Sequence, residues 1–236
     1  LSISRVIVAD NDGVVVVAVM PVCENAIDAL SYKPYAILHS HAGKTVQVGN
    51  TDAEGRLALA DAMSYVQSKF KPTTMIDVAT LTGACVVALG EYAAGLFSND
   101  LVLQRQLLNA SQRSGERCWS MPILSEHDAE LKSHFADMSS TGKVSCIASM
   151  LIIVVIVVVE CEQLTRVGAY VGRYGGASTA AAFLQRFVKP EVRWAHLDVA
   201  GPAMYSEARG YMSKGSTGFG VALLVDYLRQ GAAAGK

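Results

Sequence analysis

The sequence has 236 residues, of which 51% are hydrophobic and 17% are charged, a composition that fits one sizeable folded domain rather than a disordered chain. A formal net charge of -1 gives no basic field that would attract nucleic acid and no acidic tail. The five cysteines form no C-x-x-C pair, so we expect no disulfide framework and no structural zinc site. We expect reduced thiols in a cytosolic protein.

The N-terminal part predicts a buried parallel strand at Val14–Met20, because a continuous β-branched run is typical of a strand covered on both faces. The preceding Leu1–Gly13 has no charged region followed by a cleavage site and no initiator methionine, so we expect the start to be cut or misassigned. His39 and His41 could share a strand face, but nothing nearby completes a metal site. Lys44–Val48 alternates as a short strand.

Two carboxylates and a guanidinium fall within the segment Asn50–Leu57. Asp52 and Glu54 are two residues apart where an extended segment becomes a helix, so their oxygens can point toward one site, and hard divalent cations favour such clusters. Arg56 offers a fixed fork of donors that suits a planar oxyanion. The alternative is a capping box, because Thr51-x-x-Glu54 also has that pattern. Spacing alone favours the cap by about three to one.

Helices and strands alternate beyond this segment. Apolar residues at helical spacing predict a helix from Leu59 that ends before Pro72. The further expected elements are a buried strand at Thr74–Thr80, a helix capped by Ser98–Asp100 and running through Arg113, a shorter helix at Glu126–Phe135, a helix from Ala177 to Lys189, a strand at Arg193–Val199 and a closing helix at Val221–Arg229. Such alternation predicts an α/β fold, a three-layer α/β/α architecture with a mostly parallel mixed sheet.

The octapeptide Asn50–Leu57 resembles the defining motif of the leucyl aminopeptidase family of cytosolic dinuclear metallopeptidases. A match of eight residues is far more specific than a lone D-x-E, so it reverses the preference for a cap. Further similarities follow in the order of the family, at Val22–Asn25, Ile76–Ala84, Gly172–Ala177 and Trp194–Gly201. The resemblance covers most of the chain from about Val14 to Arg229.

This resemblance implies a metal-dependent aminopeptidase that removes leucine-like N-terminal residues from peptides with a water activated by two metal ions. Asp52 and Glu54 match metal ligands, Glu54 as the bridging one, for manganese, zinc or magnesium, which carboxylates alone do not separate. Arg56 matches the arginine that holds a bicarbonate as general base. The positions matching the substrate-lining residues are Thr80, Leu81, Gly83, Ala200, Ala203 and Met204, while Asn50 and Gly55 match residues that support the site.

The sequence departs from the family upstream of Val14–Met20. The family takes a lysine and two aspartates as further ligands, and a catalytic lysine, from a segment before that strand. Here Asp10 and Asp12 stand in no similar context. We therefore expect residues 1–236 to be a single, partial catalytic domain without the N-terminal domain of the family, with weak metal binding and little or no peptidase activity. Robust turnover by the 236-residue chain would contradict this expectation.

A second departure is the apolar segment at 144–171, which interrupts the family pattern and is aggregation-prone by composition. It is either an unspliced intron, since Val144-Ser145 can be encoded by a donor-like string, or a true insertion. Within it, Ile147–Val159 is shorter than the roughly 18 residues of a spanning helix, so we expect no membrane association. The family predicts hexamers in the cytoplasm, and the alternative function is a non-catalytic subunit of an oligomer.

Overall fold

The computed structural model describes residues 2–11, 14–142, 174–208, 210 and 212–234. Its centre is a four-stranded sheet in the order β5-β9-β6-β7, in which β5 pairs parallel with β9, β9 antiparallel with β6, and β6 parallel with β7. The strands are β5 (Thr74–Ala79), β9 (Arg193–Asp198), β6 (Ala94–Ser98) and β7 (Cys118–Ser120). The predicted mixed sheet is confirmed.

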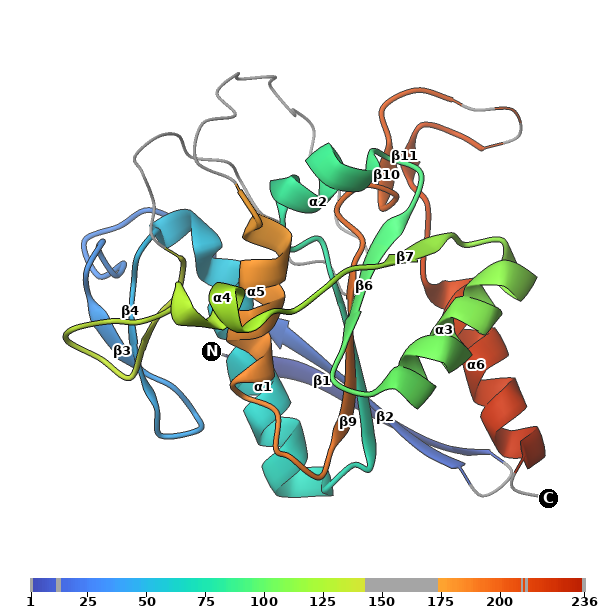
Figure 1. Cartoon of the computed structure of the whole chain (residues 1–236), viewed down its shortest axis with the longest axis horizontal. Coiled ribbons are helices and arrows are strands. Elements are labelled where there is room, and N and C mark those ends of the chain that lie inside the picture. Colours follow the sequence, from blue (N-terminus) through green and yellow to red (C-terminus); the bar gives the residue numbers. More distant parts are fainter. Residues whose placement is uncertain (1, 12–13, 143–173, 209, 211, 235–236) are drawn as a thin grey trace.

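Helices cover this sheet on both faces, with α1 and α5 on one side and α3 and α6 on the other (Figure 1). Two separate clusters of buried residues result, one under each helical layer. The helices are α1 (Glu54–Phe70), α2 (Gly83–Leu89), α3 (Leu101–Ser114), α4 (Ser125–Ala129), α5 (Gly176–Gln185) and α6 (Val221–Ala234). The three-layer prediction is therefore confirmed.

Strand β9 shows how both clusters form from one segment. Trp194 belongs to the cluster under α1 and α5, whereas Ala195 and Leu197 belong to the cluster under α3 and α6. Side chains alternate between the two faces of a strand, so His196 and Asp198 point to the same face as Trp194. All five side chains are fully buried, which places two titratable groups in the interior beneath α1.

Smaller sheets lie outside this centre. The strands β3 (Ile37–His39), β4 (Thr45–Gln47) and β8 (Met138–Ser139) form one sheet, in which β4 pairs antiparallel with β3 and parallel with β8. The strands β10 (Met204–Tyr205) and β11 (Gly215–Ser216) form another. Strand β4 is the predicted strand at Lys44–Val48, and the chain passes from it into the 3-10 turn η1 (Thr51–Ala53) and then α1.

The prediction for Val14–Met20 was wrong in its pairing. Strand β2 (Val14–Val22) pairs antiparallel with β1 (Ser2–Asn11) in a two-stranded sheet of its own. Val15 is 62% exposed and Val22 is 50% exposed, because a two-stranded ribbon leaves part of its surface uncovered. A β-branched run indicates strand formation, but it does not distinguish a covered parallel strand from an antiparallel hairpin.

Two predicted helices are shorter in the structure. The helix expected over Glu126–Phe135 ends at Ala129, and the Ser133 hydroxyl then accepts hydrogen bonds from the backbone N–H groups of Phe135 and Ala136, which holds a turn instead. The helix expected to reach Lys189 ends at Gln185. Local hydrogen bonds after the last helical turn, and not the apolar spacing, decide both ends.

The helix capped by Asp100 gives a first test of the fold. An Asp100 Oδ1 atom accepts the N–H of Leu103 at 2.6 Å, so we expect Asp100→Ala to lower the free energy of unfolding by about 1 kcal/mol. Urea unfolding monitored by circular dichroism measures this change. Arg105→Ala on the exposed face of α3 is the control and should stay within about 0.5 kcal/mol of the unchanged chain.

The segment at 144–171, with its intron, insertion and membrane interpretations, lies outside the described residues. Within the described ranges, no helix is long and apolar enough to cross a membrane.

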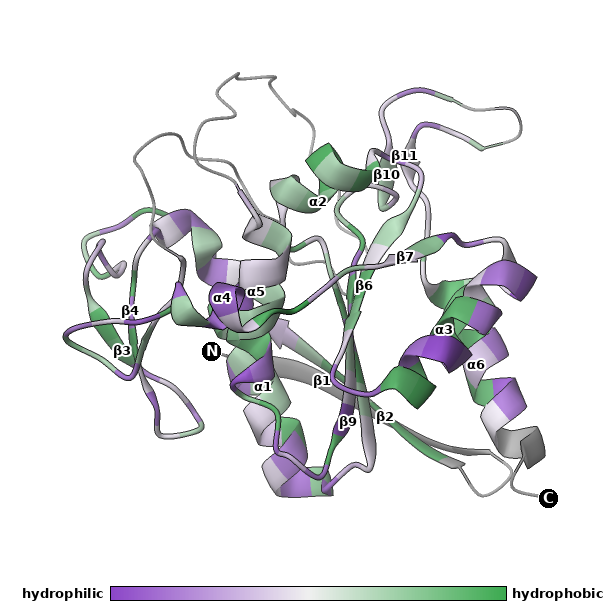
Figure 2. Ribbon diagram, in the orientation of Figure 1, coloured by the Kyte–Doolittle hydropathy of each residue, from purple (hydrophilic) through white to green (hydrophobic). Residues whose placement is uncertain are grey.

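Helix α2 is largely hydrophobic along its length, whereas α4 is largely hydrophilic (Figure 2).

Candidate active site

The start of α1 decides between the two interpretations of Thr51 and Glu54. Asn50 is the N-cap of the 3-10 turn and its side chain accepts the N–H of Asp52 at 3.1 Å. Helix α1 begins at Glu54, with Ala53 as an N-cap that makes no side-chain hydrogen bond. Glu54 is thus the first residue of its helix, not the third residue after a capping Thr51. The cap belongs to Asn50.

The Glu54 carboxylate is half-buried and has few compensating partners. Oε1 accepts one hydrogen bond from Asn25 Nδ2 at 3.2 Å. The pKa of Glu54 is raised to about 7, chiefly by burial and also by the charge of Asp52, while a backbone hydrogen bond, Arg56 and Asn25 oppose the rise. Burial, followed by the charges of Glu54 and Asp52, also raises the pKa of Tyr32 to about 12. This corner therefore carries excess negative charge, which a cation would neutralise.

Arg56 is the third residue of α1, in its first turn, and is only 7% exposed. One guanidinium nitrogen, Nη1, donates to the backbone carbonyl of Ser140 at 2.8 Å, whereas Nε is buried without a protein hydrogen-bond partner. Burial lowers the pKa of Arg56 to about 10, and Asp198 and Glu54 oppose that shift. The guanidinium stays charged at neutral pH, and its unsatisfied donor suits an anion.

Asp198, at the end of β9, joins the loops on either side of it. Its Oδ1 atom accepts the backbone N–H of Leu81 and of Ala200, each at 3.1 Å. Its Oδ2 atom accepts the Thr82 hydroxyl at 2.7 Å, and Thr82 is the N-cap of α2. Burial raises the pKa of Asp198, while His196 and these hydrogen bonds oppose the rise. The loop after β5 and the loop after β9 are therefore joined at Asp198, which also interacts electrostatically with Arg56.

A second buried carboxylate lies on the adjacent strand. Asp77 Oδ1 pairs with His196 Nδ1 at 2.5 Å, and Oδ2 accepts the indole N–H of Trp194 at 2.7 Å. Burial alone lowers the pKa of His196, but Asp77 and Asp198 outweigh this and raise it. The Nε2 atom of His196 has no partner. The interior beneath the site thus alternates acidic and basic groups.

A profile of the cytosol aminopeptidase family, catalytic domain, matches residues 1–225 of the chain. The chain belongs to this family. Similar proteins include a probable cytosol aminopeptidase of Chloroherpeton thalassium, 44% identical over 91% of this chain and 36% of that protein. Another, from Brucella melitensis biotype 1, is 45% identical over 88% of this chain and 37% of that protein. The chain thus spans little more than a third of these relatives.

A solved mutant of tomato leucine aminopeptidase has the same fold. It matches with a TM-score of 0.72 and 39% sequence identity, and the match covers 88% of this chain and 34% of that one. The α/β architecture predicted from the alternating strands and helices and the family membership predicted from the octapeptide are therefore confirmed.

The residues predicted to form the site fall into two groups in this member of the cytosol aminopeptidase family. Asp52, Glu54 and Arg56 lie together at the start of α1, and Asp198 links the region of Arg56 to Leu81 and Ala200. Of the remaining predicted residues, Asn50 caps η1 and Gly55 is buried in α1. Thr80 and Gly83 are half-buried on either side of Leu81. Ala203 packs against the cluster under α3 and α6, and Met204 is 42% exposed in β10.

The carboxylates fit a divalent cation by their chemistry. Asp52 and Glu54 crowd negative charge at a half-buried corner, and hard cations prefer carboxylate oxygens. Among the described residues, however, no group of three or more histidine, cysteine, aspartate or glutamate side chains could hold a metal ion. The ligand roles of Asp52 and Glu54, and the half-site expected from the sequence, stay predictions.

Sequence reasoning assigned no role to several residues that shape the site. Asn25 donates to Glu54 and the Tyr32 hydroxyl donates to the Thr51 carbonyl at 3.3 Å. Asn25 and Asp198 both lie in segments that resemble the family, yet only the fold shows what they touch. Of the histidine pair, His41 Nδ1 shares a hydrogen bond with the Ser64 hydroxyl at 2.9 Å.

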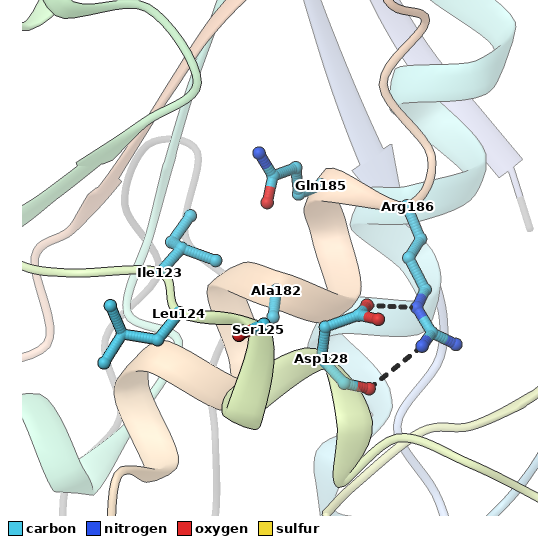
Figure 3. Close-up of a pocket in the computed structure, with 7 residues that line it drawn as sticks. All are labelled: Ile123, Leu124, Ser125, Asp128, Ala182, Gln185 and Arg186. Atoms are coloured by element: carbon cyan, nitrogen blue, oxygen red, sulfur yellow. Dashed lines mark hydrogen bonds and ion pairs between the residues drawn. The ribbon is translucent and has the colours of Figure 1, made fainter.

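A cavity of about 310 Å³ lies away from these residues, between α4 and the end of α5. Figure 3 shows Arg186 and Asp128 beside each other at its edge, joined by an ion pair of 2.6 Å. None of the predicted site residues lines this cavity. It is a surface feature of the helical layer, separate from the carboxylate corner.

The raised pKa of Glu54 predicts how stability depends on pH in a chelator. A carboxyl group whose pKa rises from 4.5 to about 7 on folding makes the folded chain bind the extra proton. The contribution of Glu54 to the free energy of unfolding therefore falls as pH rises from about 4.5 to 7 and stays unfavourable above 7. Urea unfolding at pH 5 and pH 8 should show this fall. The pKa values of His196 and Asp198 are raised as well, so the unchanged chain alone does not isolate Glu54. The diagnostic result is a smaller fall in the free energy of unfolding in Glu54→Gln than in the unchanged chain.

Proposed function

We propose that this chain supplies metal-binding carboxylates and the substrate-binding wall of a metal-dependent aminopeptidase that removes leucine-like residues from the N-termini of peptides. The observation that carries the proposal is the corner at the start of α1, where two carboxylates crowd together and a buried arginine with an unsatisfied donor follows Glu54 by two residues. This arrangement suits a cation and an anion side by side. Family membership supports the same activity.

Asp52 and Glu54 would hold two divalent ions, manganese or zinc, with magnesium as the third candidate. Such ions activate water and polarise a peptide carbonyl. Asn25 orients the Glu54 carboxylate through its 3.2 Å hydrogen bond. Asn50 and Gly55 support the turn from which both ligands project, Asn50 by capping it and Gly55 by its burial in the first turn of α1.

Arg56 would hold a bicarbonate that serves as general base. The guanidinium is fixed by the Ser140 carbonyl and keeps Nε free for a second acceptor, so it can position an oxyanion without losing its anchor. Thr80, Leu81, Gly83 and Ala200 line the substrate side of this region, and Ala203 and Met204 extend the wall. A mainly apolar wall favours leucine-like side chains.

The direct test is hydrolysis of leucine p-nitroanilide with and without added manganese. We would run it in parallel on the 236-residue chain and on the product of the full-length transcript. We expect metal-dependent turnover from the full-length product and little from the 236 residues, because no group of three or more histidine, cysteine, aspartate or glutamate side chains among the described residues could hold a metal ion. Metal-independent turnover, or none from either protein, would contradict the proposal.

A second candidate function is a non-catalytic subunit of a homo-oligomer, such as the hexamer that the family resemblance implies. The absence of a group of three metal-binding side chains from the described ranges favours it. Light scattering coupled to size-exclusion chromatography distinguishes the two functions when combined with the hydrolysis assay. An oligomer without turnover in the full-length product would favour the subunit, and turnover would favour the peptidase.

A further inference from the structure

We propose that Asp198 is a positioning residue whose carboxylate fixes the two substrate-lining segments, at Leu81 and at Ala200, in one arrangement beside Arg56. The inference rests on the proposed function and adds a residue to which neither the sequence motif nor the mechanism gives a role. Asp198 acts through these segments and not on the substrate.

The hydrogen bonds of Asp198 require an acceptor at every contact. The N–H groups of Leu81 and Ala200 converge on Oδ1. The Thr82 hydroxyl accepts the N–H of Cys85 at 3.0 Å, so its own hydrogen is available for Oδ2 of Asp198. A carboxylate accepts all three bonds, whereas an amide of the same shape loses one acceptor oxygen.

Two contacts fix helix α2, one at each end. Thr82 ties the N-terminus of α2 to Asp198, and Gly201 packs so closely on the end of α2 that a Cβ atom there would overlap the carbonyl oxygen of Gly90. The segments after β5 and after β9 are therefore joined by the Asp198 carboxylate and by the packing of Gly201 on Gly90. If the carboxylate is lost, the Leu81 and Ala200 N–H groups no longer converge on one acceptor, and we expect both segments to loosen.

Stability alone does not account for this buried charge. Asp198 is fully buried, and the pairing of β9 with β5 uses backbone hydrogen bonds that need no side chain. Charged groups buried in pairs are often replaceable by apolar residues without loss of stability. Arg56 and His196 both lie close enough to interact electrostatically with Asp198. This balance suits a residue that sets geometry at the site.

Hydrogen exchange tests the coupling without requiring activity. We expect Asp198→Ala in the full-length protein to speed amide exchange at least about tenfold in both the segment around Leu81 and the segment around Ala200. Asp77→Ala is the matched control, because Asp77 is a buried aspartate on the same face of the sheet that bonds His196 and Trp194 instead. Unchanged exchange in Asp198→Ala, or an equal rise in both segments for Asp77→Ala, would overturn the proposal.

Substrate selectivity supplies the readout that a purely structural role would not change. We expect Asp198→Ala to reduce the preference for leucine over alanine p-nitroanilide about tenfold, and Asp77→Ala to keep it. Thr82→Val, which loses one of the three bonds, covers the case in which Asp198→Ala does not fold. It should lose selectivity, and Thr82→Ser should recover it.

The outcomes separate the two proposals. A protein that hydrolyses neither substrate contradicts the proposed function, and hydrogen exchange then decides the role of Asp198. Full selectivity in both Asp198→Ala and Thr82→Val would overturn the positioning role even if the peptidase activity is present.

Discussion

Glu54→Gln should abolish metal-dependent hydrolysis and at the same time stabilise the metal-free fold. The amide keeps the shape of the side chain but removes a charge from a half-buried corner whose pKa is raised to about 7 by burial and by Asp52. We expect the free energy of unfolding at pH 8 in a chelator to increase by roughly 1 kcal/mol, discounted for partial exposure. In the full-length protein, kcat/KM for leucine p-nitroanilide should fall at least about a thousandfold.

Opposite changes in stability and function distinguish a ligand from a structural carboxylate. Glu126→Gln is the control, because Glu126 is an exposed glutamate in the first turn of α4 whose pKa is lowered by backbone and Ser125 hydrogen bonds. It should leave hydrolysis unchanged and should not stabilise the chain. Manganese titration calorimetry completes the comparison. A Glu54→Gln protein that binds manganese as tightly as the unchanged chain would refute the ligand role.

The sequence predicted the elements whose residues interact mainly with their neighbours in the chain. The helix ending before Pro72, the helix capped by Asp100 and the buried strand at Thr74–Thr80 all lie where spacing and capping residues placed them. Errors arose where residues far apart in the sequence determine the structure. The β-branched run at Val14–Met20 did not reveal that β1 would pair with it, because local propensity does not specify a partner strand.

The candidate site shows the same division. The octapeptide identified Asp52, Glu54 and Arg56, because a contiguous motif brings its own residues together. It could not identify Asp198, which accepts the backbone N–H of Leu81 because β9 lies beside β5 in the sheet. The choice between cap and ligand also needed the fold, since only the observed start of α1 shows that Asn50, rather than Thr51, is the cap.

Arg56→Lys should separate the charge of Arg56 from its hydrogen-bonding geometry. Lysine keeps a cation near Asp198, so we expect the fold to survive, but it lacks the fork that bonds the Ser140 carbonyl while presenting Nε to an anion. The kcat of the full-length protein should therefore fall about 100- to 1000-fold, with a smaller change in KM. Added bicarbonate should stimulate the unchanged protein and not the variant.

Arg56→Met should in addition destabilise the fold, because it removes the attraction between the guanidinium and Asp198 and leaves the Ser140 carbonyl without its donor. We expect the free energy of unfolding at pH 7 to fall by about 2–4 kcal/mol. Arg186→Met is the matched control, since its partner Asp128 is half-exposed, and it should cost less than about 1 kcal/mol. Equal losses in the two variants would show that the buried Arg56 guanidinium stabilises the fold no more than a half-exposed ion pair does. Normal activity in Arg56→Lys would exclude an anion held by the guanidinium fork.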